Sequence, residues 1–147
     1  MNATHENLLV GTRFGSIRFR DEDVLRFSAG LIGFPNLHRF VLIATSAFSP
    51  FQWLQSLDEA DIAFLVTDPG HFADGYKPLG DLTESSLLTT VNIPHGQPKE
   101  MTLNLAGPIL IERATRTGSQ IVLDSEAYTT KYRVFAKASR EIGSAAA

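Results

Sequence analysis

The stretch SPFQWLQSLDEADIAFLVTDP, residues 49–69, predicts two paired strands joined by an acidic turn. In a pleated strand over residues 51–56, successive side chains would point to opposite faces. Residues 62–66 are continuously apolar, as expected of a strand covered on both sides, and we expect that strand to be central in its sheet. One face of the first strand would carry Phe51, Trp53 and Gln55, and the other Gln52, Leu54 and Ser56.

Two interpretations of Trp53 follow from this pattern. In the first, the hairpin belongs to the core and the indole ring fills volume there. In the second, the hairpin presents a binding face, because Gln52 and Gln55 must meet solvent or a partner's backbone if residues 62–66 already fill the core. Both interpretations stay open at this point.

Length and composition restrict the class of protein. The 147 residues form one domain by length, and a chain of this size buries roughly 68–70% of its unfolded surface. Without cysteine the chain has no disulfide, thiolate metal ligand or cysteine nucleophile. Its apolar runs are shorter than the roughly 20 residues of a membrane helix, and residues 1–7 lack a signal-peptide pattern. We therefore expect a cytoplasmic protein that makes no membrane contact.

The net charge of −3 is unevenly distributed along the chain. Residues 46–101 hold two basic and eight acidic side chains, whereas residues 1–45 hold five basic and four acidic ones and residues 102–147 hold six and four. Nucleic-acid binding depends on clustered Lys and Arg, so we expect no direct binding of DNA or RNA. The acidic middle suits a basic protein partner or serves as a solvated surface.

Further strands are predicted on both sides of the central hairpin. Residues 14–19, an acidic turn at 21–23 and residues 24–27 predict a short hairpin, whereas residues 71–86 predict an irregular loop. The remaining strand candidates are residues 40–44, 87–93, 101–105, 109–112 and 121–123. Many short strands with few helices indicate a mainly β protein, either a small barrel or a sandwich.

The two ends of the chain are predicted to differ from a central domain at residues 10–128. Residues 1–9 lack a clear period, and we expect them to be flexible. Apolar residues at helical spacing, with Lys and Arg largely off that stripe and Gly143 at the stop position, predict a short basic C-terminal helix over residues 129–143. Residues 144–147 are expected to form a disordered tail.

No motif for catalysis, metal binding or nucleotide binding is found in the sequence. The four histidines lack the spacing of a metal site, and Asp68 and His71 are more typical of a structural pair across a turn. There is no nucleophile elbow or Walker loop. We expect no enzyme, metal or cofactor, although carboxylates gathered from separate strands would allow a small hydrolase or isomerase. An aromatic surface without a nucleophile suits the docking of an amphipathic helix.

An ordered series of motifs runs from about Gly11 to Tyr128, and its order and spacing make it specific. The motifs are Phe14-Gly15, Phe27-x-x-Gly30-Leu31-x-Gly33-Phe34, Phe40-Val41-Leu42, Ser49-Pro50-Phe51-x-Trp53-Leu54-Gln55-Ser56, Ala63-Phe64-x-Val66-Thr67-Asp68-Pro69 and Met101-Thr102-x-Asn104-Leu105-x-x-Pro108-Ile109. This series resembles the FliW family of flagellar assembly factors. Between Tyr76 and Leu88 the chain is shorter than the family pattern, and it continues after Tyr128, where the family usually stops soon.

The resemblance implies a bacterial cytoplasmic protein with a small, single-domain, antiparallel β-barrel-like fold and no catalytic activity. FliW-like proteins bind flagellin before its export and also bind the RNA-binding translational regulator CsrA. Free flagellin would occupy this protein and release the regulator to silence flagellin translation; after flagellin export, this protein would sequester the regulator again. The alternative is a chaperone for flagellin or another secreted protein, without the regulatory arm.

Seven residues are the candidates for partner binding, and all of them lie in or near the predicted hairpin and the Phe34 loop. Aromatic and amide side chains would make the contacts, and carboxylates would attract a basic partner. The contact residues are Phe34, Phe51, Trp53 and Gln55, and the acidic residues are Asp58, Glu59 and Asp61.

Overall fold

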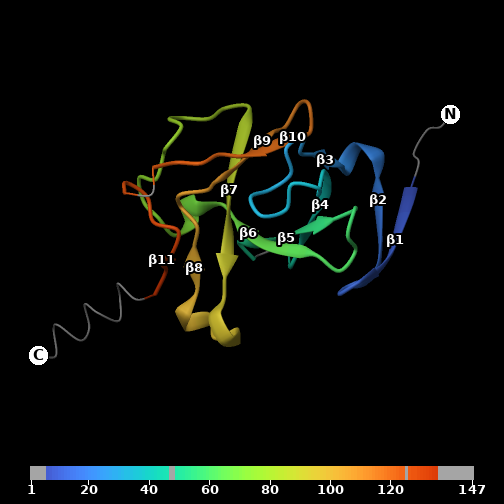
Figure 1. Ribbon diagram of the computed structural model, residues 1–147, viewed down its shortest axis with the longest axis horizontal. Coiled ribbons are helices and arrows are strands. Elements are labelled where there is room, and N and C mark those ends of the chain that lie inside the picture. The colour runs from blue at the N-terminus through green and yellow to red at the C-terminus, as the bar shows by residue number, and fades with distance from the viewer. Residues whose placement is uncertain (1–5, 47–48, 125, 136–147) are drawn as a thin grey trace, which may run out of the picture.

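The computed structural model describes residues 6–46, 49–124 and 126–135, and these residues form a mainly β protein, as predicted (Figure 1). The strands that lie within one residue of their predicted positions are β4, β5, β6 and β9. The strands are β1 Glu6–Thr12, β2 Gly15–Arg20, β3 Leu25–Arg26, β4 Arg39–Ala44, β5 Phe51–Ser56, β6 Ala63–Thr67, β7 Ser85–Asn92, β8 Thr102–Leu103, β9 Ile109–Glu112, β10 Thr117–Gln120 and β11 Tyr132–Arg133. The 3₁₀ turns are η1 Asp21–Asp23, η2 Pro69–His71, η3 Pro94–Gly96 and η4 Pro98–Glu100.

Nine strands form one sheet, and part of this sheet closes into a ring. The strand order is β11-β8-β7-β6-β5-β4-β3-β10-β9, and a further pairing of β7 with β9 closes the ring from β7 to β9. Strand β6 lies between β5 and β7, so its predicted central position is confirmed. The expectation of an antiparallel sheet is wrong at one place, because β3 and β10 pair in parallel at Arg26 and Thr117.

The interior of the ring holds the main hydrophobic core. Leu54 on β5 lies opposite Phe64 on β6, and both pack in this core because alternate residues of paired strands share a face. The rings of Phe27 and Phe40 pack edge to face with their centroids 5.1 Å apart. The buried members of the core are Leu25, Phe27, Leu31, Leu37, Phe40, Leu54, Val66, Leu88, Ile109 and Ile111.

Strands β1 and β2 form a separate hairpin, residues 6–20, which we call the flap (right of Figure 1). The predicted hairpin of residues 14–19 with 24–27 is wrong, because β2 pairs with β1 while β3 joins β4 and β10. Residues 6–9, expected to be flexible, are therefore part of a strand. Packing explains the difference: the flap covers apolar residues on the outer face of β4. The second core cluster consists of Val24, Val41 and Leu57 with Leu9, Ile17, Phe19 and Ile43 packed against it.

The C-terminal segment begins with a strand where a helix was predicted. Tyr132 and Arg133 form β11 and pair with β8, and the N–H of Val134 donates to the carbonyl of Met101 at 3.3 Å. The prediction of a helix is therefore wrong for residues 129–135, none of which is helical. The edge of β8 supplies backbone partners to residues 132–133, and an apolar cluster lies beneath them. The rest of the predicted helix, residues 136–143, and the predicted tail lie outside the described residues.

The predicted strand at residues 121–123 is displaced toward the N-terminus. The strand is β10, and Gly118 lies inside it. The chain turns before β10 near Arg116, whose φ is 56°. Gly118 is glycine for a packing reason, since a Cβ there would lie 2.3 Å from the ring of Phe27. No helix in the described part of the chain is long and apolar enough to cross a membrane.

Candidate partner-binding surface

The outer face of strands β4, β5 and β6 carries a row of large apolar side chains. Ile43, Trp53 and Leu65 are aligned across the three strands by their pairing registers. They point away from the ring interior because their chain neighbours, Leu54 among them, fill the core. The strand alternation therefore places Trp53 outside the main core.

The outer face is hollowed next to Trp53 by an apolar groove of about 240 Å³. All of the residues that line it are half-buried, and none of them carries a charge. Contiguous apolar surface that is open to solvent occurs at interaction sites, and this groove is smaller than the roughly 300–1,000 Å³ of small-ligand pockets. The lining residues are Trp53, Ala63, Phe64, Leu65, Thr90, Val91 and Ile93, and we call this feature the Trp53 groove.

The tip of the flap lies against Trp53. The ring of Phe14 packs at 5.4 Å from the indole centroid, and the guanidinium carbon of Arg13 lies 5.0 Å from it, as in a cation–π contact. Phe14 remains 37% exposed. Trp53 thus combines a packing role, because it contacts the flap, with a position in an open groove.

The other two predicted aromatic residues lie outside the Trp53 groove. Phe51 is half-buried and stacks on Phe72, with ring centroids 5.7 Å apart. Phe34 is 38% exposed and packs edge to face on Phe64 at 5.1 Å. Phe34 does not line the Trp53 groove, although its neighbour Phe64 does.

Gln55 was predicted to contact a partner, but the structure buries it completely. Its Nε2 donates to the carbonyl oxygens of Ser56, Ala60 and Ile62 at 2.8, 2.9 and 3.2 Å. Gln55 does share a face with Trp53, as predicted, but its cross-strand neighbour Val41 lies in the cluster under the flap. Its role here is to order the turn between β5 and β6, and we exclude it from the contact surface.

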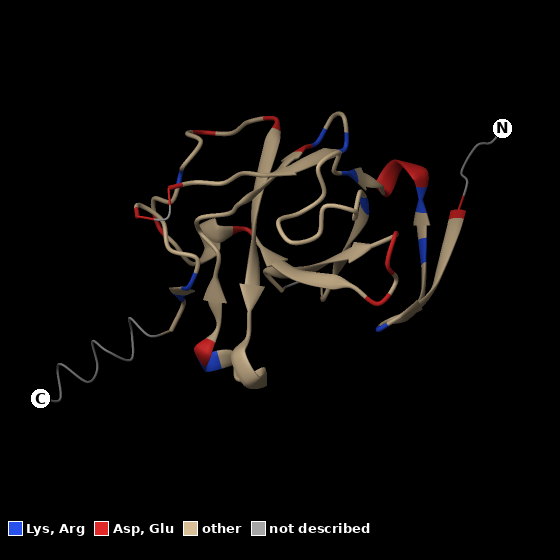
Figure 2. Cartoon of the chain, viewed as in Figure 1, with Lys and Arg blue, Asp and Glu red and all other residues tan. Residues whose placement is uncertain are grey.

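The turn between β5 and β6 is acidic (Figure 2), and its three carboxylates differ in their partners within the described residues. Asp58 accepts from the N–H groups of His38 and Arg39 at 2.7 and 3.0 Å, and it pairs with the Arg39 guanidinium at 3.2 Å. Partial burial alone would raise the pKa of Asp58, but these N–H donors and the Arg39 charge together hold it below its usual value. Glu59 and Asp61 are exposed, and no ion pair involves them within the described residues.

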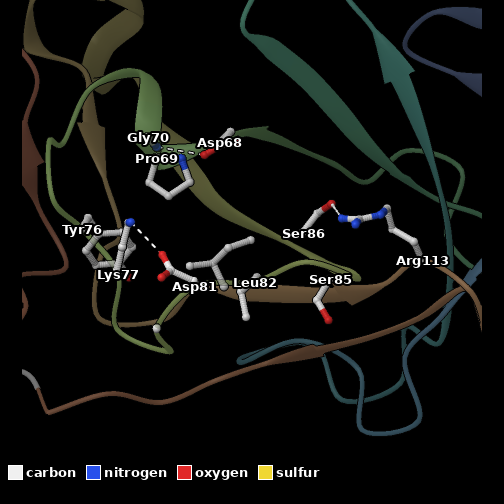
Figure 3. Close-up of a pocket in the computed structure, with 12 residues that line it drawn as sticks. Asp68, Pro69, Gly70, Tyr76, Lys77, Asp81, Leu82, Ser85, Ser86 and Arg113 are labelled. Carbon is white, nitrogen blue, oxygen red and sulfur yellow. Dashed lines mark hydrogen bonds and ion pairs between the residues drawn. The ribbon is translucent and has the colours of Figure 1, made fainter.

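A second, polar cleft of about 420 Å³ lies between η2, the following loop and β7 (Figure 3). Lys77 and Asp81 form an ion pair across it at 2.7 Å, and the Arg113 guanidinium donates to the hydroxyl of Ser86 at 2.7 Å. From the sequence, this loop was predicted only to be irregular, and the cleft was not predicted. The acidic composition of the loop was the one signal that pointed to it. The acidic residues of this region are Asp68, Asp74, Asp81 and Glu84.

The catalytic pair considered from the sequence does not assemble. The carboxylate of Asp68 accepts the N–H of Gly70 at 2.9 Å and thereby caps η2, while the side chain of His71 is exposed. The carboxylates with a shifted pKa, Asp58 and Asp81, both have it lowered, which is the direction that keeps a carboxylate ionised. Within the described ranges, no group of three or more His, Asp or Glu residues is placed to hold a metal ion.

Comparison with known proteins agrees with the resemblance. A sequence model of the FliW protein family matches residues 9–134. Flagellar assembly factor FliW of Leptospira interrogans (serovar copenhageni) is 36% identical, over 88% of this chain and 94% of the relative. The protein of the same name from Natranaerobius thermophilus is also 36% identical, over 86% of this chain and 91% of the relative.

A solved structure extends this similarity to three dimensions. The crystal structure of the flagellar assembly factor FliW has a TM-score of 0.77 and 26% identity, over 88% of this chain and 97% of that one. The family model ends at residue 134, so part of the segment after Tyr128, expected to lie beyond the family pattern, is matched as well. Strand β11 lies within this matched part. The chain therefore belongs to the FliW family of flagellar assembly factors.

Proposed function

We propose that this protein binds flagellin and a CsrA-type translational regulator and that each partner weakens the binding of the other. The observation that carries this proposal is the Trp53 groove, an open apolar surface on a member of the FliW family. Binding of flagellin would release the regulator to silence flagellin translation, and export of flagellin would reverse this step.

The Trp53 groove is proposed as the flagellin site. An amphipathic helix buries its apolar face in a groove of this kind, and the terminal helices of flagellin are the helices we expect there. Trp53 and Leu65 would supply most of the apolar contact, because aromatic side chains in partly buried pockets dominate such interfaces. Phe14 at the flap tip would close one side of the groove.

The exposed carboxylates are proposed to attract the regulator, which is basic because it binds RNA. Glu59 and Asp61 on the β5–β6 turn and the acidic loop before β7 carry charge of the required sign (Figure 2). Such charges raise the association rate and make it sensitive to salt more than they raise affinity. Asp58 is excluded from this role because its carboxylate is already engaged by His38 and Arg39.

The test is calorimetric titration of the protein with flagellin and with the regulator, each alone and then in the presence of the other. Mutual weakening is expected, and a typical coupling of about 1–3 kcal/mol would change affinity roughly 5–150-fold. If flagellin binds and the regulator does not, the protein is a chaperone without the regulatory arm. Failure of both partners to bind would refute the proposal.

Matched variants locate the two sites. Trp53→Ala is expected to weaken flagellin binding by at least about tenfold, whereas Ile32→Ala, which removes an exposed apolar side chain elsewhere, should leave it unchanged. Glu59→Gln with Asp61→Asn should slow association of the regulator at low salt, with little effect on flagellin. Weakening of both partners by Ile32→Ala would place the binding surface at another position.

A further inference from the structure

A third pocket, of about 440 Å³, lies over strands β10, β3 and β4 and has no part in the proposed function. Arg26, Arg39 and Asp58 are among the residues that line it. Its volume falls within the range of about 300–1,000 Å³ that is usual for small-ligand sites.

The pocket contains two arginines directly opposite each other. Arg26 on β3 is in register with Arg39 on β4, and the neighbouring pair in the same ladder, Leu25 with Phe40, is fully buried in the ring interior. Because successive residues of a strand alternate, both arginine side chains project outward into the same space. Like charges directly opposite one another in a sheet repel, and a counter-charge between these two exposed arginines would relieve the repulsion.

The described part of the chain supplies that counter-charge for only one of the two arginines. Asp58 pairs with Arg39 at 3.2 Å, and no ion pair with Arg26 occurs in the described residues. Two guanidinium groups and one carboxylate leave one net positive charge. A ligand with one negative charge would balance the pocket, and a guanidinium binds a carboxylate through two parallel hydrogen bonds.

The floor of the pocket is kept open by local packing. Gly118 lies over the Phe27 ring, and a side chain at this position would collide with that ring, since its Cβ would be 2.3 Å away. Nδ1 of His38 lies 2.9 Å from the carbonyl oxygen of Phe27. A carbonyl only accepts, so Nδ1 carries the proton, and this bond fixes the imidazole at the wall of the pocket.

We propose that this pocket binds a carboxylate group, with Arg26 as its ion-pair partner. The carboxylate belongs either to a small organic acid or to a peptide. Both sources present the same monoanion to Arg26, and the two arms of the experiment separate them.

The experiment is a titration of the ¹⁵N-labelled full chain followed by amide chemical shifts. The probes are sodium benzoate and a blocked glutamate peptide, acetyl-Gly-Glu-Gly-amide, with sodium chloride at matched ionic strength as the control. Saturable shifts centred on Ser28, His38 and Gly118 are expected. Saturation with benzoate alone identifies a small acid and saturation with the peptide identifies a peptide carboxylate; either result supports the site. Shifts that do not saturate, or that chloride reproduces, overturn it.

Variants of the pocket provide the second test. Arg26→Gln is expected to weaken binding of the probe by at least about tenfold, whereas Arg20→Gln, which removes an exposed arginine on the flap, should not change it. Thr117→Glu places a carboxylate on β10 opposite Arg26 and should abolish binding while raising the melting temperature. Full binding by the Thr117→Glu protein would contradict the proposal.

Discussion

The inner and outer faces of strands β5 and β6 have different roles although they belong to the same short stretch of chain. On the inner face Leu54 and Val66 are fully buried in the ring. On the outer face Trp53 and Leu65 remain half-buried and line an open groove. Because of strand alternation, the inward residues stabilise the ring and their outward neighbours line the groove. Substitutions on the outer face should therefore leave the ring core intact.

The outer face is itself divided by the flap. Where the flap covers it, Val41 is buried in the second core cluster. Beyond the flap tip, the groove between Trp53 and Val91 stays open. The boundary is Phe14, which touches Trp53 and is still partly exposed. Access to the outer face is therefore decided by the length and position of a separate hairpin.

The largest effect is expected on the inner face. Leu54→Ala should lower the free energy of unfolding by about 2–5 kcal/mol, because it leaves a cavity in the ring core. Urea denaturation measures this. The matched outer-face variant Leu65→Ala should cost less than about 1.5 kcal/mol. Equal losses of unfolding free energy in the two variants would show that the two faces contribute equally to stability.

A smaller loss is expected for Gly118→Ala, which tests the contact of β10 with the core. The added methyl group would meet the Phe27 ring, and overpacking of this kind costs about 1–3 kcal/mol. The double variant Gly118→Ala with Phe27→Leu should lose less than the sum of the two single variants, since the smaller side chain makes room. Strict additivity in denaturation experiments would show that the two residues do not interact.

Trp53→Ala separates the two roles of the outer face. We expect it to destabilise the protein by about 1–2 kcal/mol, less than a fully buried aromatic residue would, because Trp53 is half-buried. Flagellin binding should fall by a larger factor than this loss explains. A protein that melts several degrees lower but binds both partners normally would assign Trp53 to the core alone.

Asp58→Asn should give the smallest effect, about 1 kcal/mol near neutral pH, because it weakens the acceptor for His38 and Arg39. The pKa of Asp58 is lowered in the folded protein, so its stabilising contribution is present above the ordinary value of 3.8 and is lost as pH falls through the lower folded value. The two proteins should therefore converge in stability in acid. Glu59→Gln is the control, and a similar pH-dependent difference for that variant would contradict the structural role of Asp58.

Apolar runs and alternation in the sequence were enough to predict the central strands. These patterns correctly placed β4, β5, β6 and β9, and the alternation in β5 put Trp53, Phe51 and Gln55 on one face. It could not show that Gln55 would be buried, because the carbonyl groups that its side chain binds are brought to it by the folded turn after β5. The partner of β2 was missed because residues 6–9 become a strand only when Leu9 packs on the ring.

The sequence by itself determined the central strands, the acidic middle of the chain and membership of the FliW family, because these depend on local periodicity, composition and ordered motifs. Only the tertiary structure decided which positions of the outer face stay open, that Tyr132 and Arg133 extend the sheet, and that Arg26 faces Arg39. These features arise where segments far apart in the chain meet, and the energies that select such contacts are those of burial and pairing between segments.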